Sequence, residues 1–295
     1  MKISNKNKAI LFLIMSAFFF TLMNMFVRLS GDLPTVQKMF FRNLIAAIIA
    51  FIILIKNKQS FLPKSKKNIM TLSLRSLAGL LGVFCNFYAV DKLVLSDASI
   101  LNKMSPFFAV IFSFLLLKER PKFFQLIAVF VAFVGAVFVI KPSFYNTSLV
   151  PAVVGFIGGA CAGLAYTFVR KATLNGEHSA YVVFFFSAVS TIVILPFLIF
   201  DYHTMSFYQL CMLLFAGFSA AGGQFMITLA YKNAPSKEVS VYDFSQVIFA
   251  AIIGFFAFEQ IPDLYSFIGY FIIVMTAVLN FMYTNKLLLF KKKKT

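Results

Sequence analysis

The chain has 295 residues, of which 61% are hydrophobic and 13% are charged, and its formal net charge is +17. A soluble protein of ordinary composition has about 25% charged residues, so these values exclude a soluble globular domain. The positive charge does not indicate nucleic-acid binding either, because the lysines lie in short connections between long apolar blocks.

The apolar blocks are about twenty residues long, which is the length of a membrane-spanning helix. We therefore expect an all-α polytopic membrane protein with ten spans. The first is interpreted as a retained span rather than a cleaved signal, because no small-residue cleavage site follows it. The predicted spans are 9–27, 34–55, 69–90, 97–117, 122–140, 149–170, 179–200, 206–230, 238–258 and 263–285.

Lysine and arginine are concentrated in alternate connections. The N-terminal tail, the even-numbered connections and the C-terminus are basic, whereas the odd-numbered connections offer little beyond Lys92 and Lys141. Basic connections stay on the cytoplasmic side of a membrane. We therefore expect a multi-pass protein of the plasma (inner) membrane with both termini in the cytoplasm. The basic end of the chain, Lys291–Lys294, suits anionic lipid headgroups.

Two stretches repeat one plan at a spacing of 140 residues. Ser99–Pro121 and Val239–Pro262 each open with polar residues, continue as an apolar run and close with a glutamate and a proline, and Lys103 and Asp243 occupy equivalent positions. Each half then contains five spans. Because five is odd, the second half enters the membrane upside down relative to the first, and such repeats place a substrate site between them near the midplane. The predicted repeats are residues 1–145 and 146–295, the second including the basic tail.

The chain resembles the drug/metabolite transporter superfamily, in particular its EamA-type members. The resemblance is carried by Leu74-Arg75-Ser76-Leu77, Ser105-Pro106-Phe107-Phe108 and Leu117-Lys118-Glu119-Arg120. It implies that the first, third, fourth, sixth, eighth and ninth spans line a central cavity. It also implies that the fifth and tenth lie at the periphery or in a homodimer interface. Gln246 stands where the first half has Pro106, so a helix-breaking role of this proline would be confined to the first half.

No arrangement of residues indicates catalysis. Hydrolase triads, phosphate loops, dinucleotide fingerprints and zinc motifs are not recognisable, and the three cysteines fall inside apolar blocks without metal-ligand spacing. We therefore expect no enzyme activity, no metal and no cofactor. Glu119 and Glu259 each precede a proline and a new apolar run, so we expect them at the beginning of the next helix, where a carboxylate is favourable.

Polar residues inside the spans indicate a binding site. They recur at spacings of three and four on the same helical faces. The alternative is that they make interhelical hydrogen bonds, each contributing about 0.6 kcal/mol. For the charged residues a functional role is favoured, because an ionisable group at membrane depth is costly. The predicted substrate-binding residues are Asn24, Arg42, Asn86, Asn102, Lys103, Tyr166, Gln224, Tyr242, Asp243 and Gln246.

Depth along uninterrupted helices predicts how the charges pair. Lys103 would lie roughly 6 Å to the outer side of the midplane and Asp243 a similar distance to the inner side, so a direct bond between them is not expected. Arg75 is predicted near Asp243, as a structural ion pair, which would leave Lys103 and Arg42 without a counter-charge. Pro106 is predicted to loosen its helix and serve in gating.

These features favour a secondary transporter that moves a small polar metabolite, anionic or zwitterionic and amino-acid-like, by alternating access. An exporter of amphipathic or toxic compounds is the alternative within that class. From another class, a lipid flippase or a structural membrane subunit remains open. A flippase needs a polar groove that opens sideways to lipid, whereas a transporter would enclose Lys103 and Asp243. The expected partners are a small metabolite and membrane lipids.

Overall fold

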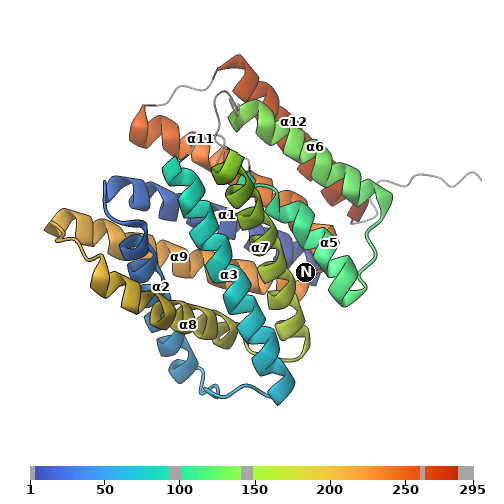
Figure 1. Cartoon of the computed structure of the whole chain (residues 1–295). Helices are drawn as coiled ribbons and strands as arrows, with labels where there is room; N and C mark the ends of the chain where they lie inside the picture. The colour runs from blue at the N-terminus through green and yellow to red at the C-terminus, as the bar shows by residue number, and fades with distance from the viewer. Residues whose placement is uncertain (1–3, 93–100, 141–148, 260–262, 285–295) are drawn as a thin grey trace, which may run out of the picture.

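The computed structural model describes residues 4–92, 101–140, 149–259 and 263–284, and within these ranges every regular element is helical (Figure 1). The elements are α1 (Asn5–Leu29), α2 (Thr35–Lys56), α3 (Lys66–Lys92), α5 (Ser105–Leu117), α6 (Phe123–Ile140), α7 (Leu149–Leu174), α8 (Ser179–Phe200), α9 (Phe207–Asn233), α10 (Ser236–Val239), the 3-10 helix η1 (Ser240–Phe244), α11 (Ser245–Phe258) and α12 (Leu264–Thr284).

The helices have the length and composition of membrane spans. Eight stretches of described residues are long and apolar enough to cross a membrane, and two shorter apolar helices, Ser105–Leu117 and Phe123–Phe138, correspond to the fourth and fifth predicted spans. Large apolar side chains also cover the outside of the bundle: Phe123 is 78% exposed and Phe200 is 90% exposed. A soluble monomer rarely exposes such a surface. The predicted ten-helix membrane fold is confirmed.

The main contacts between helices of the first half and helices of the second have equivalents in which the two halves trade places. In the repeat, α1 corresponds to α7, α3 to α9 and α5 to α11. α1 packs on α9 just as α3 packs on α7, and α11 packs on α1 just as α5 packs on α7. α6 packs along its own counterpart α12 at one edge of the bundle (Figure 1). This exchange defines a pseudo-two-fold axis between two inverted five-helix repeats. The predicted boundary at 145/146 lies outside the described residues.

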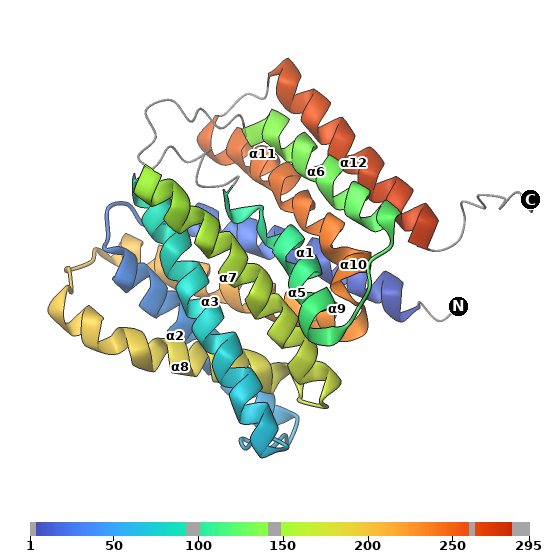
Figure 2. The ribbon, with the colours of Figure 1, turned by 45° about the vertical axis from the view of Figure 1, so that its right-hand side comes forward.

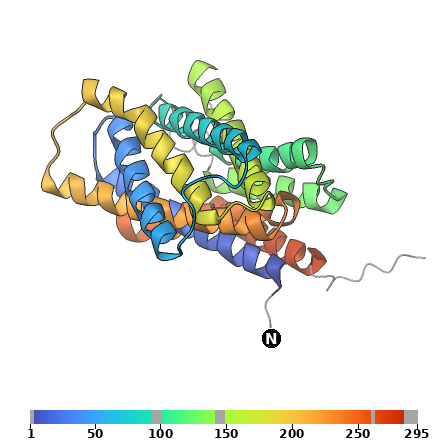
Figure 3. The same ribbon diagram turned by 90° about the horizontal axis from the view of Figure 1, so that it is seen from below.

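Most basic connections gather at one end of the bundle. α1 begins and α12 ends on the same side (Figure 2), and the α1–α2 and α8–α9 connections lie at the other end (Figure 3). Contacts join several basic loops: Lys6 Nζ lies 3.4 Å from Glu238 Oε2, and Lys237 Nζ donates to the Arg120 carbonyl at 2.9 Å. We call this the basic end; it carries Lys6, Lys64, Arg120, Arg170, Lys232 and Lys237.

The equivalent helix in each repeat is broken at the centre of the bundle. In the first repeat a helical segment ends at Asn102, a turn follows at Lys103 and Met104, and α5 begins at Ser105 with Pro106 in its first turn. In the second repeat the short helix α10 is followed by η1, and α11 begins at Ser245. The helix is therefore broken in both halves, although only the first break has a proline at this position.

Two glycines of α7 position the first break. A Cβ atom on Gly159 would lie 2.5 Å from the Leu101 carbonyl oxygen, and one on Gly163 would lie 2.7 Å from the Ala109 amide nitrogen. Any side chain at either position would push this backbone away from α7. The absence of a Cβ therefore allows the broken helix to lie directly against α7.

Candidate functional site

Lys103 and Asp243, which are repeat equivalents, form an ion pair. Lys103 Nζ lies 3.2 Å from Asp243 Oδ2, and both residues are buried. The predicted separation in depth is therefore wrong, because it assumed uninterrupted helices. The breaks leave half-helices of 13 and 14 residues, α5 and α11, each about 20 Å long. Both charged residues consequently lie at the centre of the bundle.

Contact between Lys103 and Asp243 also locates the pseudo-two-fold axis of the bundle. Two equivalent residues of a two-fold repeat can touch only if both lie close to the symmetry axis. Lys103 Nζ also donates to Gln246 Oε1 at 2.6 Å and approaches the Asp243 carbonyl oxygen at 3.4 Å. The pseudo-two-fold axis therefore passes close to the Lys103–Asp243 pair, where the two broken helices meet.

A cavity lies next to this pair, enclosed by both repeats. Its lining comes from α1, α2, α3, α7, α8, α9, α11 and Asn102, and α6 and α12 do not contribute. Of the predicted substrate-binding residues, Lys103, Tyr242 and Asp243 are buried outside the lining. Those that line the cavity are Asn24, Arg42, Asn86, Asn102, Tyr166, Gln224 and Gln246.

The cavity extends away from the basic end. Asn24 lies in the last turns of α1, Arg42 in the first turns of α2 and Asn86 in the last third of α3. All three positions are on the side of the bundle opposite the basic end, and Asn24 is exposed. The cavity therefore reaches toward the end of the bundle opposite the basic end.

Two buried arginines line the cavity without a carboxylate partner among the described residues. The predicted pair of Arg75 and Asp243 is absent: Arg75 Nη2 instead donates to Gln224 Oε1 at 2.9 Å, and its guanidinium lies 3.6 Å from the centre of the Phe186 ring. Within the part of the chain that the structure describes, Arg75 Nε and Nη1 have no hydrogen-bond partner. Arg42 Nε faces the Met23 sulfur at 3.2 Å, a weak acceptor, and Arg42 Nη1 has no partner among the same residues.

The position of the Arg75 guanidinium depends on Gly79, one turn later in α3. A Cβ atom on Gly79 would lie 2.5 Å from Arg75 Nη1 and 2.8 Å from the Phe186 ring. Stacking of Arg75 on Phe186 therefore requires a glycine at this position. The stack holds the guanidinium at the cavity wall by a cation–π contact.

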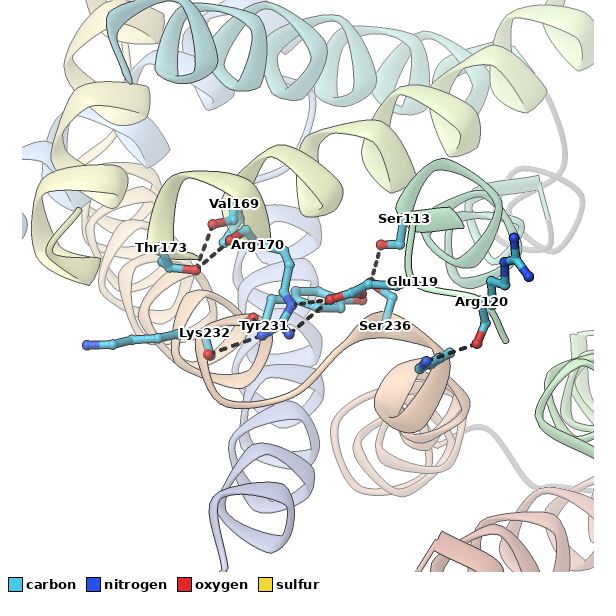
Figure 4. Close-up of polar contacts among 10 residues, drawn as sticks. Ser113, Glu119, Arg120, Val169, Arg170, Thr173, Tyr231, Lys232 and Ser236 are labelled. Atoms are coloured by element: carbon cyan, nitrogen blue, oxygen red, sulfur yellow. Dashed lines mark hydrogen bonds and ion pairs between the residues drawn. The ribbon is translucent and has the colours of Figure 1, made fainter. Parts of the chain in front are cut away.

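Below the cavity, toward the basic end, the bundle is sealed. Tyr166, which lines the cavity, stacks on the buried Tyr231 with ring centres 5.4 Å apart. One turn beyond Tyr166, Arg170 donates through Nε to Glu119 Oε1 at 3.0 Å, and its Nη2 lies 2.9 Å from the same oxygen. Its Nη1 donates to the Tyr231 and Lys232 carbonyls at 3.0 and 3.2 Å (Figure 4). One guanidinium thus joins α7 to the ends of α5 and α9.

The predicted position of Glu119 at the beginning of the next helix is wrong. This carboxylate does not begin the next helix, because α6 begins only at Phe123. Lys118 adopts a left-handed conformation (φ 57°) that ends α5, and the chain then turns Glu119 toward Arg170. Ser113 and Ser236 add a hydrogen bond of 3.0 Å between α5 and α10 (Figure 4). Sequence reasoning recognised Arg170 only as a basic loop residue; its recurrence in the Phe-Val-Arg triplets at 26–28 and 168–170 was the available signal.

The inverted repeats, the broken helices and the central polar cavity define a membrane transporter fold. The chain belongs to the EamA-like transporter family, whose model matches residues 7–141 and 150–282. A crystal structure matches with a TM-score of 0.82 over 95% of this chain and 98% of that chain, at 14% identity, a likeness that shows the fold.

Several curated relatives are named as transporters. The chain is 30% identical over 272 residues to the pseudopaline exporter CntI of Pseudomonas aeruginosa, covering 91% of this chain and 94% of the relative. It is 24% identical to human solute carrier family 35 member G1, covering 90% and 76%. It is 22% identical to the S-adenosylmethionine uptake transporter of Rickettsia bellii, covering 90% and 89%. The names of the family and its members indicate a transporter rather than an enzyme.

Proposed function

We propose that the protein is a secondary transporter of a small organic anion or zwitterion, whose acidic group binds between Arg42 and Arg75. The observation that carries this proposal is the charge distribution at the cavity. Asp243 is paired with Lys103, while the two arginines that line the cavity keep unpaired guanidinium nitrogens. A carboxylate or phosphate is the natural partner of such groups, because it accepts two parallel hydrogen bonds from a guanidinium.

The free-energy cost of burying two arginines at membrane depth supports the proposed anionic substrate. Arg42 is 5% exposed and Arg75 is 2% exposed. An arginine at membrane depth costs about 2.5–3.5 kcal/mol on insertion scales. An anionic substrate would offset part of that cost, and each hydrogen bond to a charged group would contribute about 1.5–3 kcal/mol. The amides of Asn86, Asn102 and Gln224 line the same space and suit the remaining polar groups of a metabolite.

We further propose alternating access across the plasma membrane, with the basic end and both termini in the cytoplasm. In this conformation the Arg170–Glu119 contact and the Tyr166–Tyr231 stack close the basic end. The inverted repeats supply the second conformation, in which the two halves exchange their roles and the cavity opens at the basic end. The named relatives include both an exporter and an uptake transporter, so the direction of transport is left to experiment.

The aromatic lining supports a more amphipathic substrate as the second candidate. Phe20, Phe87 and Phe186 contribute rings to the cavity beside the two arginines. An acid with an apolar body would use both kinds of wall, and its export is the corresponding physiological role. A lipid flippase is less favoured, because helices of both repeats surround the cavity.

Binding by purified protein tests the proposed function. Thermal stability is measured in detergent with a panel of L-glutamate, citrate and succinate, and with L-lysine as the cationic comparison. We expect at least one acid to stabilise the wild type and L-lysine not to. Arg42→Ala and Arg75→Ala should each weaken the binding of that acid by roughly ten- to a hundredfold. Arg120→Gln is the matched control, because the contact that Arg120 makes within the described residues uses its backbone carbonyl, which the variant keeps. Stabilisation by L-lysine alone, or undiminished acid binding in both arginine variants, would overturn the proposal.

A further inference from the structure

We infer that Asp243 binds and releases one proton in each transport cycle, with Lys103 holding the carboxylate between these events, so that organic anion and proton cross the membrane together. This inference rests on the proposed binding of an anion at Arg42 and Arg75. It assigns to the Lys103–Asp243 pair, which does not line the cavity, a role distinct from substrate contact.

Asp243 is singled out by burial and position. Among the described residues, the buried carboxylates are those of Asp243 and Glu177. Glu177 lies in the α7–α8 connection at the basic end, where its Oε1 accepts from the Lys64 amide at 2.8 Å and from Asn68 Nδ2 at 2.6 Å. These bonds tie two loops together. Asp243 instead lies at the centre, one contact away from the cavity wall.

Lys103 connects Asp243 to the cavity. Its ammonium group is shared between Asp243 Oδ2 and Gln246 Oε1, and Gln246 lines the cavity, as does Asn102 beside Lys103. A substrate that hydrogen-bonds to the Gln246 amide, or that attracts the positive charge of Lys103, therefore changes the ion pair between Lys103 and Asp243. Substrate binding in the cavity and proton binding at Asp243 are therefore linked through Lys103, although Asp243 does not line the cavity.

Few other ionisable groups face Asp243. α5, α6 and α11 contain none, and α12 contributes only tyrosines. In α1 and α10 the charged residues lie at helix ends: Lys6, Lys8 and Arg28 in α1, and Lys237 and Glu238 in α10. Among the described residues, Lys103 contacts the carboxylate, and Tyr166 of α7 and Tyr231 of α9 lie close enough to be affected by its charge. Both tyrosines are neutral at physiological pH.

The sign of the coupling follows from charge balance. With Asp243 ionised, the positive charges of Arg42, Arg75 and Lys103 exceed the single negative charge by two. Transfer of a proton from water to the Asp243 carboxylate adds one positive charge, which favours an anion in the cavity. By reciprocity, a bound anion favours the protonated carboxylate to the same extent. Proton and anion therefore bind together and leave together.

The position of the pair on the pseudo-two-fold axis satisfies the remaining requirement. A coupling group must become reachable from each side in turn. Exchange of the two repeats moves the peripheral helices most, whereas groups on the axis stay at the centre. Asp243 is thus placed to receive a proton from one side and release it to the other.

Proton movement in liposomes tests this inference. The full-length protein is reconstituted with the pH-sensitive dye pyranine inside, and L-glutamate, citrate and succinate are added outside in turn. For any acid that the wild type transports, we expect the lumen to acidify in a fixed proton-to-anion ratio. An inwardly acidifying pH gradient should also drive accumulation of that acid. Transport of an acid without proton movement would overturn the inference while leaving the proposed function intact.

Variants separate coupling from a merely structural role. Asp243→Asn should lose acidification and gradient-driven accumulation but retain exchange of internal for external labelled acid. The single variant leaves the Lys103 ammonium buried without its carboxylate, which could prevent folding. The double variant Lys103→Gln/Asp243→Asn removes both charges and should show the same loss of acidification and accumulation with exchange retained. Glu177→Gln, the other buried carboxylate, should keep the wild-type proton-to-anion ratio. An unchanged ratio in either Asp243 variant, or equal loss of exchange and accumulation, would refute proton coupling at Asp243.

Discussion

The broken helix of the first repeat and that of the second occupy equivalent places, but they differ in charge and in how the break is formed. The first places a lysine at the break and has Pro106 in the first turn of α5. The second places an aspartate there and reaches α11 through a 3-10 turn without proline. The backbone plan is thus shared, while the side chains are complementary. Complementary charges at equivalent positions allow the two breaks to bind each other on the axis.

The two helices also differ where they end. The residue that follows α5 is Lys118 and the one that follows α11 is Glu259, both in the left-handed conformation, with φ of 57° and 54°. Glu259 therefore matches Lys118, and the position matching Glu119 is Gln260, which lies outside the described residues. The chain thus places a carboxylate against Arg170 at the basic end, one residue beyond the left-handed residue that follows α5.

Reversing one charge of the central pair should have the largest effect. Lys103→Asp places two carboxylates at the axis and should cost about 3–5 kcal/mol, as expected when a buried pair is broken. The exchanged variant, Lys103→Asp with Asp243→Lys, should recover most of this loss, because the positions are equivalent. Thermal unfolding and size-exclusion profiles in detergent measure both. An exchanged variant no more stable than the single one would contradict the symmetry of the two breaks.

The contact of each broken helix with its neighbour gives the second prediction. Gly163→Ala forces a methyl group against the backbone of α5 and should cost about 1–3 kcal/mol, as overpacking does. In the second repeat the equivalent position is Thr21 of α1, whose hydroxyl approaches the Gln246 carbonyl at 3.5 Å. Thr21→Ala should cost less than about 1 kcal/mol. Thermal unfolding of the two variants side by side checks the order, and equal losses would show that both helices are held alike.

The sequence predicts most of the fold for simple reasons. The apolar blocks match membrane thickness, so the helices lie within a few residues of their predicted bounds, except that the predicted beginning of the fourth span lies outside the described residues. The spacing of 140 residues reveals the repeat. The break before Ser245 could not be predicted, because no proline marks it. The tertiary contacts at this break, such as the bond between Lys103 and Gln246 across the repeats, are not visible in the sequence.

The candidate site is predicted in its residues but not in its pairing. Helical periodicity placed Asn24, Asn86 and Gln224 on the inner faces, where they line the cavity. Pairing of charges depends on depth, and depth was derived from unbroken helices. One break in each repeat moved Lys103 and Asp243 together and left Arg75 to bind Gln224. Phe186 gave no signal in the sequence, because it is one of 41 phenylalanines.

The two helix ends provide a third, smaller prediction. Glu119→Gln weakens the closed basic end and should shift the balance between conformations by about 1.4 kcal/mol, a factor of roughly ten. A single cysteine at Ala165, with Cys85, Cys161 and Cys211 replaced, reports access to the cavity from the basic end. Its labelling by a membrane-impermeant reagent should become faster in Glu119→Gln. Glu259→Gln is the matched control and should leave the labelling rate unchanged.

The smallest effect is expected at Pro106, which distinguishes the two breaks. A proline in the first turn of a helix removes no hydrogen bond, because the amides there have no partner within the helix. Pro106→Ala should therefore change stability by less than about 1 kcal/mol. Transport should nevertheless slow, because alanine lets the helix continue through Lys103 and resist the motion at the break. The measurement is uptake per monodisperse protein in liposomes, compared with Val110→Ala, a buried substitution of the same helix away from the break. A transport rate equal to that of the wild type would give Pro106 a packing role only, and the two breaks would then work equally well with and without proline.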